Sequence, residues 1–574
     1  MKKDTTNITS RILLDVAAEH GVTDIICSPG SRNSPLLIAA YCRDSLHKHV
    51  ITDERVAAFF ALGMAMVSQR PVMLVCTSGS AILNYAPAVA EAFYHGVPLI
   101  VVSADRPKEW IDQDDSQTIR QDGILSNIVK KSYDIQVSPE SESSSFKEYS
   151  WFCNRIVNEA MLASMRPKRG PVHLNIRLSP PLTGIETLPE NIREERIVRE
   201  YRPESKLPAD IMNELAKRAA GKKIMLVAGF GAPNQRLNRA VNEFGKLDNV
   251  TVMAETISNI HSDGDYASVD LSLSLADSEL LPDIIISVGG ALVSRNLKEY
   301  LRKNTNGEHW CLGSSDTVVD CFMSLTTKIE IDASSFLLRL ASLLRRNPVV
   351  SRSNYNIKWT EIRKRTREYH NRYLATLPWC DMKAFEIILS SIPSSWNLFL
   401  SNGTPVRYGQ LFDYPFHATF CNRGVSGIDG CTSTAIGGAC ATHVPTALIT
   451  GDLSFTYDLG ALGIPLSLDT GIIIFVISNG GGGIFRFIKS TAALEEELLD
   501  KYFCVRPDVD IASIAKGFGF DYIAIDNNNY LSAGESIKQL CGTKHRNSTI
   551  VEVKTDGSLS AKILRNYFEN IHNK

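Results

Sequence analysis

Short runs of β-branched and aliphatic residues alternate along the chain with longer segments whose apolar residues recur at helical spacing. This alternation is typical of α/β domains, in which a buried parallel strand is followed by a helix that covers the sheet. It predicts three groups of strands: DIICSPG, HVITDE, VMLVCTSG, LIVVSAD and VHLNI; then KIMLVAGFG, NVTVMAET, IIISVGG and HWCLGSS; then WNLFLSNG, TALITGD, IIIFVISN, YIAID and TIVEV.

Two polar stretches separate the groups. Residues 182–208 are charged and contain prolines, which favours a linker, and we interpret the polar, basic residues 343–381 as a helix plus a second linker. At 574 residues the chain is also too long for a single hydrophobic core. We therefore expect an α/β protein of three doubly wound parallel-sheet domains, over residues 1–185, 208–345 and 380–574.

The first and last groups contain one plan twice: a strand, a polar turn, a helix and a second strand. Aligning Ser78 with Asp452 puts Asp105 opposite Asn479, because both intervals are 27 residues. Two similar α/β domains would produce this pattern, although any two strand-helix-strand units can match by chance.

The composition of the chain mainly excludes certain classes of protein. With 44% hydrophobic residues, 22% charged residues and a net charge of -2, the chain does not resemble a disordered protein, a nucleic-acid binder or an anionic-membrane binder. The twelve cysteines form no C-x-x-C pair, which favours a reducing compartment. No apolar segment follows the N-terminal lysines, and the longest strongly apolar stretch is far shorter than the ~20 residues needed to span a bilayer. We expect a cytoplasmic protein.

An aspartate and an asparagine follow two strands of the last group. Asp452 ends TALITGD, and Asn479 opens SNGGGG at the end of the next strand. Parallel strands separated by one helix present their carboxyl ends side by side, where ligands bind. A carboxylate and an amide oxygen suit Mg²⁺, and the glycines leave backbone groups open to a diphosphate. The alternative is a helix N-cap beside an ordinary loop.

Glu54 begins an almost wholly apolar helix that we expect to be buried on nearly all sides. Its carboxylate could simply complement the helix dipole, or it could serve chemistry at the neighbouring Thr77-Ser78-Gly79 turn.

Arginines recur just beyond predicted strand ends, among Gly, Ser or Pro. A single loop arginine is usually a solvated surface residue, whereas several at strand ends favour a converging anion site. The five are Arg32, Arg106, Arg295, Arg407 and Arg423.

Taken together, GDLS-x₂-YD and SNGGGGIF resemble the diphosphate and metal motif of the thiamine diphosphate (ThDP) enzymes. SPGSRNSP, TDER, TSGSA, SADRP, SQTIRQ and NRGVSGIDG match, in order, the branch of that family in menaquinone biosynthesis. The resemblance spans nearly the whole chain and is weakest from about residue 190 to 380. It implies the pyruvate-oxidase-like architecture, ThDP with Mg²⁺ or Mn²⁺, and a homodimer or homotetramer. The implied activity is a decarboxylating carboligase that adds the four-carbon unit of 2-oxoglutarate to isochorismate.

The resemblance also implies roles for single residues. Glu54 would contact the aminopyrimidine N1′ and promote loss of the thiazolium C2 proton, and Ile428 would bend the cofactor, unless it is an ordinary core isoleucine. The implied cofactor residues are Glu54, Thr77, Ile428, Asp452, Leu453, Ser454, Asn479 and Gly481, of which Asp452, Asn479 and the Gly481 carbonyl would bind the metal. The implied substrate residues are Ser31, Arg32, Arg106 and Gln117 for isochorismate, Arg407 and Arg423 for the oxoglutarate-derived unit, and also Arg295, Thr404, Ile484 and Phe485. This chain has Gly403 where relatives often have Ser, and Arg295-Asn296 where relatives have Lys-Arg.

Two alternatives remain open at this point. One is another ThDP-dependent carboligase or 2-oxo acid decarboxylase, such as an acetolactate-synthase-like enzyme. The other is a non-catalytic nucleotide-binding protein that uses the loop GFGAPNQ from Gly229, although this loop lacks the full G-x-G-x-x-G pattern.

Overall fold

The computed structural model describes residues 3–188, 195–201, 203, 206–261, 269–304, 306–313, 317–346, 354–442, 444–465, 471–543 and 547–573. The chain divides into two compact units, one formed by Met1–Arg202, Gly424–His443 and Asp458–Leu466, the other by Pro203–Arg423, Val444–Tyr457 and Ser467–Lys574. Both predicted linkers lie partly outside the described residues. Three large parallel sheets confirm the expected α/β class.

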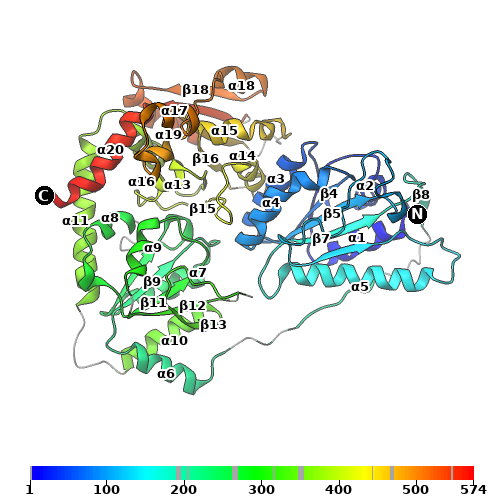
Figure 1. The fold of residues 1–574 in the computed structure, drawn as a ribbon, viewed down its shortest axis with the longest axis horizontal. Helices are drawn as coiled ribbons and strands as arrows, with labels where there is room; N and C mark the ends of the chain where they lie inside the picture. The colour runs from blue at the N-terminus through cyan, green and yellow to red at the C-terminus, as the bar shows by residue number, and fades with distance from the viewer. Residues whose placement is uncertain are drawn as a thin grey trace. The chain divides into compact units, whose positions relative to one another are not determined.

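The first unit contains one six-stranded parallel sheet of order β3-β2-β4-β5-β7-β6 (Figure 1). Its strands are β2 (Asp24–Cys27), β3 (His47–Val50), β4 (Val72–Cys76), β5 (Leu99–Asp105), β6 (Ser132–Ile135) and β7 (Val172–Arg177). Its helices are α1 (Ile8–Glu19), α2 (Ser34–Tyr41), α3 (Glu54–Ser68), α4 (Ala81–His95), the 3₁₀ turn η1 (Lys108–Trp110) and α5 (Phe146–Met165). The short strands β1 (Lys3–Thr5) and β8 (Ile185–Thr187) pair antiparallel.

The second unit contains two parallel sheets. The first has the order β10-β9-β11-β12-β13, with β9 (Ile224–Ala228), β10 (Val250–Ala254), β11 (Ile284–Val288), β12 (Glu308–Leu312) and β13 (Leu325–Ile329). Around it lie α6 (Ala209–Ala219), α7 (Gln235–Gly245), η2 (Thr256–Ser258), α8 (Val269–Ser274), η3 (Ser278–Leu280), α9 (Arg295–Arg302), α10 (Ala333–Arg346) and α11 (Tyr355–Ala375).

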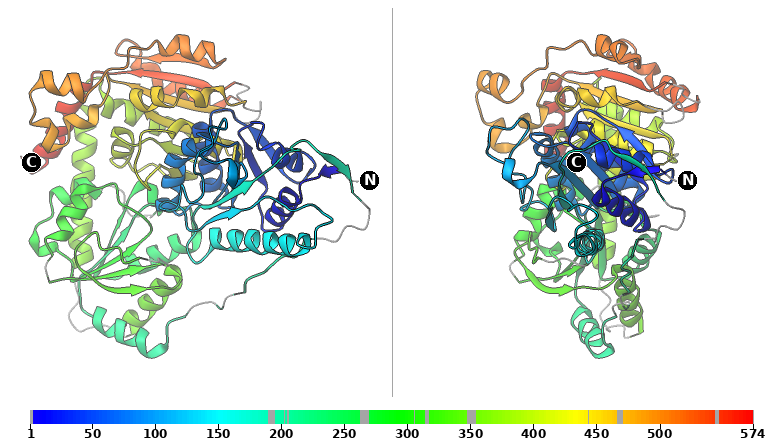
Figure 2. Two further views of the ribbon diagram at one scale, coloured as in Figure 1. Left: turned by 45° about the vertical axis from the view of Figure 1, so that its right-hand side comes forward. Right: turned by 90° about the vertical axis from the view of Figure 1, so that its right-hand side faces the viewer.

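The second sheet of this unit has the order β15-β14-β16-β17-β19-β18. Its strands are β14 (Asn397–Leu400), β15 (Ala418–Phe420), β16 (Thr446–Gly451), β17 (Ile472–Ser478), β18 (Asp521–Ile525) and β19 (Thr549–Lys554). Its helices are α12 (Asp381–Ser391), α13 (Thr404–Gly409), α15 (Asp452–Tyr457), η5 (Gly483–Arg486), α16 (Lys489–Ala492), α17 (Glu496–Tyr502), α18 (Ile511–Gly517), α19 (Tyr530–Gly542), α20 (Gly557–Glu569) and η6 (Asn570–Asn573). Helix α11 lies beside α20, where Tyr369 donates to the Tyr567 carbonyl at 2.7 Å (Figures 1 and 2).

The two six-stranded sheets have the same topology. Counted along the chain within each sheet, the strand order is second, first, third, fourth, sixth, fifth in both. The repeated plan in the sequence therefore reflects two like sheets, because β4-β5 and β16-β17 occupy equivalent places. Asp105 ends β5, and Asn479 directly follows β17.

Helix α14 (Cys431–Ala441) belongs to the first unit together with η4 (Leu459–Gly463), and α14 packs directly on α3. The two backbones approach closely through glycines: a Cβ on Gly63 would lie 1.9 Å from the Thr434 carbonyl oxygen, and one on Gly437 would lie 2.0 Å from that of Phe60. Residues 56–66 of α3 are all buried, as its apolar sequence predicts. This packing fixes the helix that begins at Glu54.

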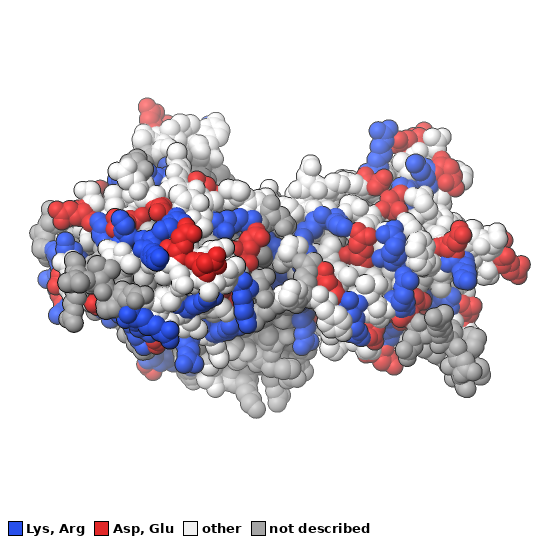
Figure 3. Space-filling view, turned by 90° about the horizontal axis from the view of Figure 1, so that it is seen from below, with Lys and Arg blue, Asp and Glu red and all other residues white. Residues whose placement is uncertain are grey.

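The described surface carries both charges. On the face drawn in Figure 3, Lys and Arg are interspersed with Asp and Glu, in agreement with the near-zero net charge. None of the described helices is long and apolar enough to cross a membrane.

Candidate functional site

The turn after β4 presents two buried hydroxyl groups that need partners. Thr77 Oγ1 and Ser78 Oγ are buried and have no hydrogen-bond partner among the described residues. Gly79 has a φ of +84°, and its N–H donates to Gln121 Oε1 at 2.8 Å, which fixes the turn. Gly30 leaves room for this turn, since a Cβ there would lie 2.5 Å from the Thr77 Cβ. Unpaired buried hydroxyl groups at a strand end suit a polar ligand.

Glu54 stands beside this turn at the start of α3. The helix is capped by Asp53, whose carboxylate accepts the Val56 N–H at 3.1 Å, so Glu54 is not needed as the cap. Glu54 Oε2 lies 3.4 Å from Asn84 Nδ2. Burial raises the pKa of the Cys76 thiol at the end of β4, and the charge of Glu54 adds to the rise, which places this carboxylate near the turn.

Ile428 belongs to a segment of the first unit that is anchored at both ends. At one end the Glu91 carboxylate accepts the Gly424 and Val425 N–H groups at 2.6 and 2.7 Å. At the other end Gly430 packs so closely on Phe59 that a Cβ would lie 2.0 Å from the ring. Ile428 itself is 39% exposed, so it is not an ordinary core isoleucine.

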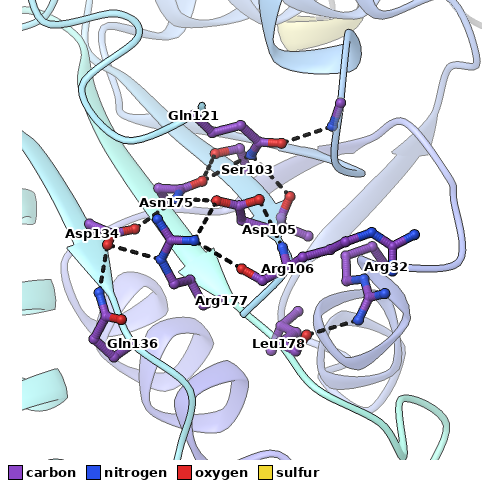
Figure 4. Close-up of polar contacts among 12 residues, drawn as sticks. Arg32, Ser103, Asp105, Arg106, Gln121, Asp134, Gln136, Asn175, Arg177 and Leu178 are labelled. Atoms are coloured by element: carbon purple, nitrogen blue, oxygen red, sulfur yellow. Dashed lines mark hydrogen bonds and ion pairs between the residues drawn. The ribbon is translucent and has the colours of Figure 1, made fainter. Parts of the chain in front are cut away.

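Arg32 and Arg106 lie close together at the ends of strands in the first unit (Figure 4). Arg32 is 8% exposed and donates to the Leu178 carbonyl at 2.9 Å. Burial lowers its pKa, and the nearby Arg106 charge lowers it further. Arg106 donates to the Ser116 carbonyl and pairs with Asp115 at 2.9 Å. Two guanidinium groups placed this way form an anion-binding corner.

A buried polar network that the sequence did not reveal supports this corner. Asn175 donates to Asp105 and Asp134 at 2.9 and 2.8 Å and accepts from Ser103 and Gln121, so its amide is fully satisfied (Figure 4). The network continues at both ends. Gln121 holds the Gly79 N–H, and Asp105 accepts the Arg106 N–H at 2.8 Å. One continuous chain of hydrogen bonds therefore joins the turn after β4 to the backbone of Arg106.

Arg177 is the cation of this network. It pairs with Asp105 and Asp134 at 3.2 and 3.0 Å and donates to the Arg106 carbonyl at 3.0 Å. Asp105 and Arg177 therefore hold Arg106 by its backbone N–H and carbonyl, while the guanidinium of Arg106 pairs with Asp115.

Asp452 organises the glycine loop of the second unit. It is 4% exposed, and its Oδ2 accepts the Gly480 and Gly481 N–H groups at 3.1 and 2.9 Å. Burial raises its pKa. Gly480 and Gly481 have φ values of +88° and +99°, so the loop needs glycine here. Asp452, Asn479 and Gly481 are thus brought together at the ends of β16 and β17, as predicted.

Asn479 is held by an acid outside every predicted motif. Its Nδ2 donates to Asp381 Oδ2 at 2.8 Å. The Asn479 amide oxygen, the Asp452 carboxylate and the Gly481 carbonyl are oxygen atoms of the type that Mg²⁺ or Mn²⁺ binds, and the Gly481 carbonyl also accepts the Gly483 N–H at 2.6 Å. No cluster of three or more His, Cys, Asp or Glu side chains suited to a metal occurs among the described residues. A metal here would therefore need oxygens from its ligand as well, which fits a diphosphate.

Arg407 and Arg423 form a second pair of arginines, in the second unit. Arg423 is 9% exposed; it donates to Asn402 Oδ1 at 3.0 Å and to the Leu292 carbonyl at 3.3 Å, and its Nε is buried without a partner. Arg407 is exposed at the surface, but partial desolvation of its guanidinium lowers its pKa, and the Arg423 charge adds to this.

A buried glutamate, also missed from the sequence, supports Arg423. Glu255 is 1% exposed and accepts the Val293 and Ser294 N–H groups at 2.8 and 2.7 Å, which fixes the loop that carries the Leu292 carbonyl. Burial raises the pKa of Glu255 to about 7.

Several other predicted residues are placed less distinctively. Arg295 begins α9, has a 76% exposed side chain and pairs with Glu299 at 2.7 Å. Gly403 has a φ of +93°, which explains why glycine rather than serine stands before Thr404. Thr404 begins α13, and its methyl group lies 3.9 Å from the position of a Cβ on Gly483.

Of the remaining residues, Leu453 and Ser454 lie in α15, and Ile484 and Phe485 lie in η5. Ser31 and Gln117 are exposed, Leu453 and Ile484 are half-buried, and Ser454 is buried. Phe485 packs edge-on against Phe503.

The glycines of the loop from Gly229 have a packing role. A Cβ on Gly229 would lie 2.0 Å from the Gly290 carbonyl, so close backbone contact accounts for this glycine without a nucleotide.

Comparisons with known proteins identify what the chain is similar to. A family model described as the N-terminal TPP binding domain of thiamine pyrophosphate enzymes matches residues 8–124, and one for their C-terminal TPP binding domain matches residues 403–553. The chain is 39% identical over 569 residues to the 2-succinyl-5-enolpyruvyl-6-hydroxy-3-cyclohexene-1-carboxylate synthase of Porphyromonas gingivalis, covering 98% of this chain and 96% of that one. Proteins of the same name from Flavobacterium psychrophilum and Bacteroides thetaiotaomicron are 37% and 32% identical, covering 97% and 100% of this chain and 98% and 100% of their own.

A solved structure, benzoylformate decarboxylase from Polynucleobacter necessarius, matches with a TM-score of 0.68. The match covers 96% of this chain and 99% of that one at 14% identity, which shows a shared fold.

Proposed function

The chain belongs to the family of 2-succinyl-5-enolpyruvyl-6-hydroxy-3-cyclohexene-1-carboxylate synthases, which are thiamine pyrophosphate enzymes of menaquinone biosynthesis, and we propose which of its residues perform that synthesis. The reaction breaks the C1–C2 bond of 2-oxoglutarate, releases CO₂ and joins the remaining four-carbon unit to the ring of isochorismate. Membership of this family excludes the two alternatives left open by the sequence, an acetolactate-synthase-like enzyme and a non-catalytic nucleotide-binding protein.

The first unit would activate the cofactor. When bound, ThDP supplies an electron sink for the carbanion that loss of CO₂ leaves. Glu54 would hold a proton at N1′ of the aminopyrimidine, Thr77 would give its unpaired hydroxyl to the cofactor, and Ile428 would pack beneath it. The capped helix, the orphaned hydroxyl and the exposed isoleucine support these three roles.

The second unit would hold the diphosphate through a metal. Asp452, the Asn479 amide oxygen and the Gly481 carbonyl would bind Mg²⁺ or Mn²⁺, and Leu453 and Ser454 would lie against the diphosphate. The all-oxygen donor set and the two positive-φ glycines support this proposal.

Two arginine pairs, one in each unit, are the observation that carries the substrate assignment. Arg32 and Arg106, with Ser31 and Gln117, would bind isochorismate. Arg407 and Arg423, with Thr404, would bind the carboxylate of the oxoglutarate-derived unit, and Ile484 and Phe485 would pack against it. Both substrates are dicarboxylic acids, so each requires a cationic anchor of its own.

The test is a defined incubation. The protein is mixed with ThDP, Mg²⁺, 2-oxoglutarate and isochorismate, and the product is identified by mass spectrometry. We expect the mass of the carboligation product together with CO₂ release. Formation of acetolactate from pyruvate at a higher kcat/KM would overturn the substrate assignment.

We also propose that the active enzyme is a homodimer or homotetramer in the cytoplasm. None of the twelve cysteines, all of which lie in the described part of the chain, forms a disulfide, which supports a reducing compartment. Light scattering with activity measured across the same dilution series tests the oligomer, because a fully active monomer would contradict it.

A further inference from the structure

Asp381 is a buried carboxylate that no motif in the sequence singles out. It begins α12, is 1% exposed and lies 98 residues before Asn479. Its two oxygens have different partners: Oδ2 accepts from Asn479 Nδ2 at 2.8 Å, and Oδ1 accepts from Thr555 Oγ1 at 2.5 Å. Its own N–H donates to Ser560 Oγ at 3.0 Å. The carboxylate is therefore held by Asn479 and Thr555, and the backbone N–H of the same residue is held by Ser560.

The contact with Asp381 decides which way the Asn479 amide faces. An asparagine side chain has a donating NH₂ end and an accepting oxygen end of nearly the same shape, and only the oxygen can bind a metal ion. An amide oxygen turned toward Asp381 would meet a carboxylate that cannot donate while it is ionised. The NH₂ end is thus held at Asp381, and the oxygen is turned away from it.

We propose that Asp381 is a positioning residue for the metal site: by holding the NH₂ end of Asn479, it presents the Asn479 oxygen to the cation. The inference rests on the proposed metal site and adds a residue to it. Partners that orient a metal ligand without touching the metal typically contribute about 10- to 100-fold in affinity. Thr555 donates to the other oxygen of Asp381 and makes no contact of its own with the Asn479 amide in this arrangement, so it is not part of the positioning contact.

Mn²⁺ binding to the full chain in the presence of ThDP tests this directly, because free Mn²⁺ is counted by electron paramagnetic resonance without any turnover. Asp381→Ala should raise the Kd for Mn²⁺ about 10- to 100-fold. Asp381→Asn should have a smaller effect, because the substituted amide can still accept from Asn479 while donating to Thr555. Thr555→Val is the matched control and should stay close to wild type, since the carboxylate keeps its contact with Asn479.

Two further variants show whether Asp381 acts through Asn479. In an Asn479→Ala background, Asp381→Ala should have no additional effect. The double variant Asp381→Asn with Thr555→Val should bind Mn²⁺ more weakly than either single variant, because the substituted amide is then free to turn its own NH₂ group toward Asn479. The comparison of the Asp381→Asn, Thr555→Val double variant with its two single variants still tests the proposal if Asp381→Ala does not fold.

The outcomes separate the inference from the proposed function. If Asn479→Ala loses Mn²⁺ affinity while Asp381→Ala and the Asp381→Asn, Thr555→Val double variant bind like wild type, the positioning role is wrong and the metal site stands. If Asp452→Ala and Asn479→Ala both keep wild-type affinity, the metal site itself is wrong and the positioning role falls with it.

Discussion

Replacing Arg32 by alanine tests the assignment of the acceptor substrate. Arg32 is 8% exposed and lies beside Arg106, and its only hydrogen bond in the described part of the chain goes to the Leu178 carbonyl. The rest of its guanidinium group is therefore available to a carboxylate. Loss of one charge-assisted contact costs about 1.5–3 kcal/mol, which corresponds to about a 10- to 150-fold higher KM for isochorismate.

The same change should also affect stability, but through a separate contact. Losing the donor to the Leu178 carbonyl should lower the free energy of unfolding by about 1–3 kcal/mol. Urea unfolding measures this effect independently of KM. Arg32→Lys should give an intermediate KM, because an ammonium keeps the charge but cannot make a two-pronged contact.

The assay titrates isochorismate at saturating 2-oxoglutarate and also follows CO₂ release without isochorismate. That slow decarboxylation should persist in Arg32→Ala, since the four-carbon unit is assigned to other arginines. Arg155→Ala is the matched control, because this exposed arginine on α5 pairs with Glu159 and lies over the Trp151 and Phe152 rings at the surface, and its loss should leave KM unchanged. An unchanged KM in Arg32→Ala, or loss of the slow decarboxylation, would refute the separate-anchor reasoning.

The remaining predictions concern the cofactor, the donor and acid stability. The Glu54→Gln variant should still bind ThDP, but NMR should no longer show exchange of the thiazolium C2 proton of the bound cofactor. Exchange at the wild-type rate would exclude the role assigned to Glu54. Arg423→Ala should slow both carboligation and decarboxylation of 2-oxoglutarate alone, and normal decarboxylation in steady-state kinetics would contradict it. Burial lowers the pKa of His173 from 6.5 to about 4, so its neutral form stabilises the fold above pH 6.5 and this contribution is lost as the pH falls toward 4. The loss is on the order of 3 kcal/mol, and His173→Gln should reduce the difference in urea unfolding between pH 7 and pH 5.

Much of the fold could be predicted because buried parallel strands carry a strong local signal. The apolar runs predicted β4, β5, β16 and β17 because each is buried along nearly its whole length. The edge strands β6 and β13 were missed because their mixed burial leaves polar residues such as Asp134 and Lys328 within them. An edge strand pairs on one side only, so its sequence need not be continuously apolar.

The site could be predicted in part, for the same reason. Asp452 and Asn479 lie directly at strand ends, where periodicity and turn residues locate them. Asp381, Asn175 and Glu255 were missed because each is a single polar residue whose partners lie tens of residues away. A sequence shows that such a residue is polar, but only the fold shows that it is buried and must be paired.

The contacts that the arginines make in the structure favour ligands that carry carboxylate groups. Arg106 pairs with the half-buried Asp115, but the buried acids near Arg32 and Arg423 are already engaged: Asp105 by Asn175 and Arg177, and Glu255 by two backbone N–H groups. Within the described residues, the hydrogen bonds of Arg32 and Arg423 go only to neutral oxygens. A buried guanidinium without an anionic partner is costly, so each site favours a ligand that brings its own carboxylate. One such site would suffice for a simple decarboxylase, whereas one in each unit agrees with the proposal that donor and acceptor each bring a carboxylate.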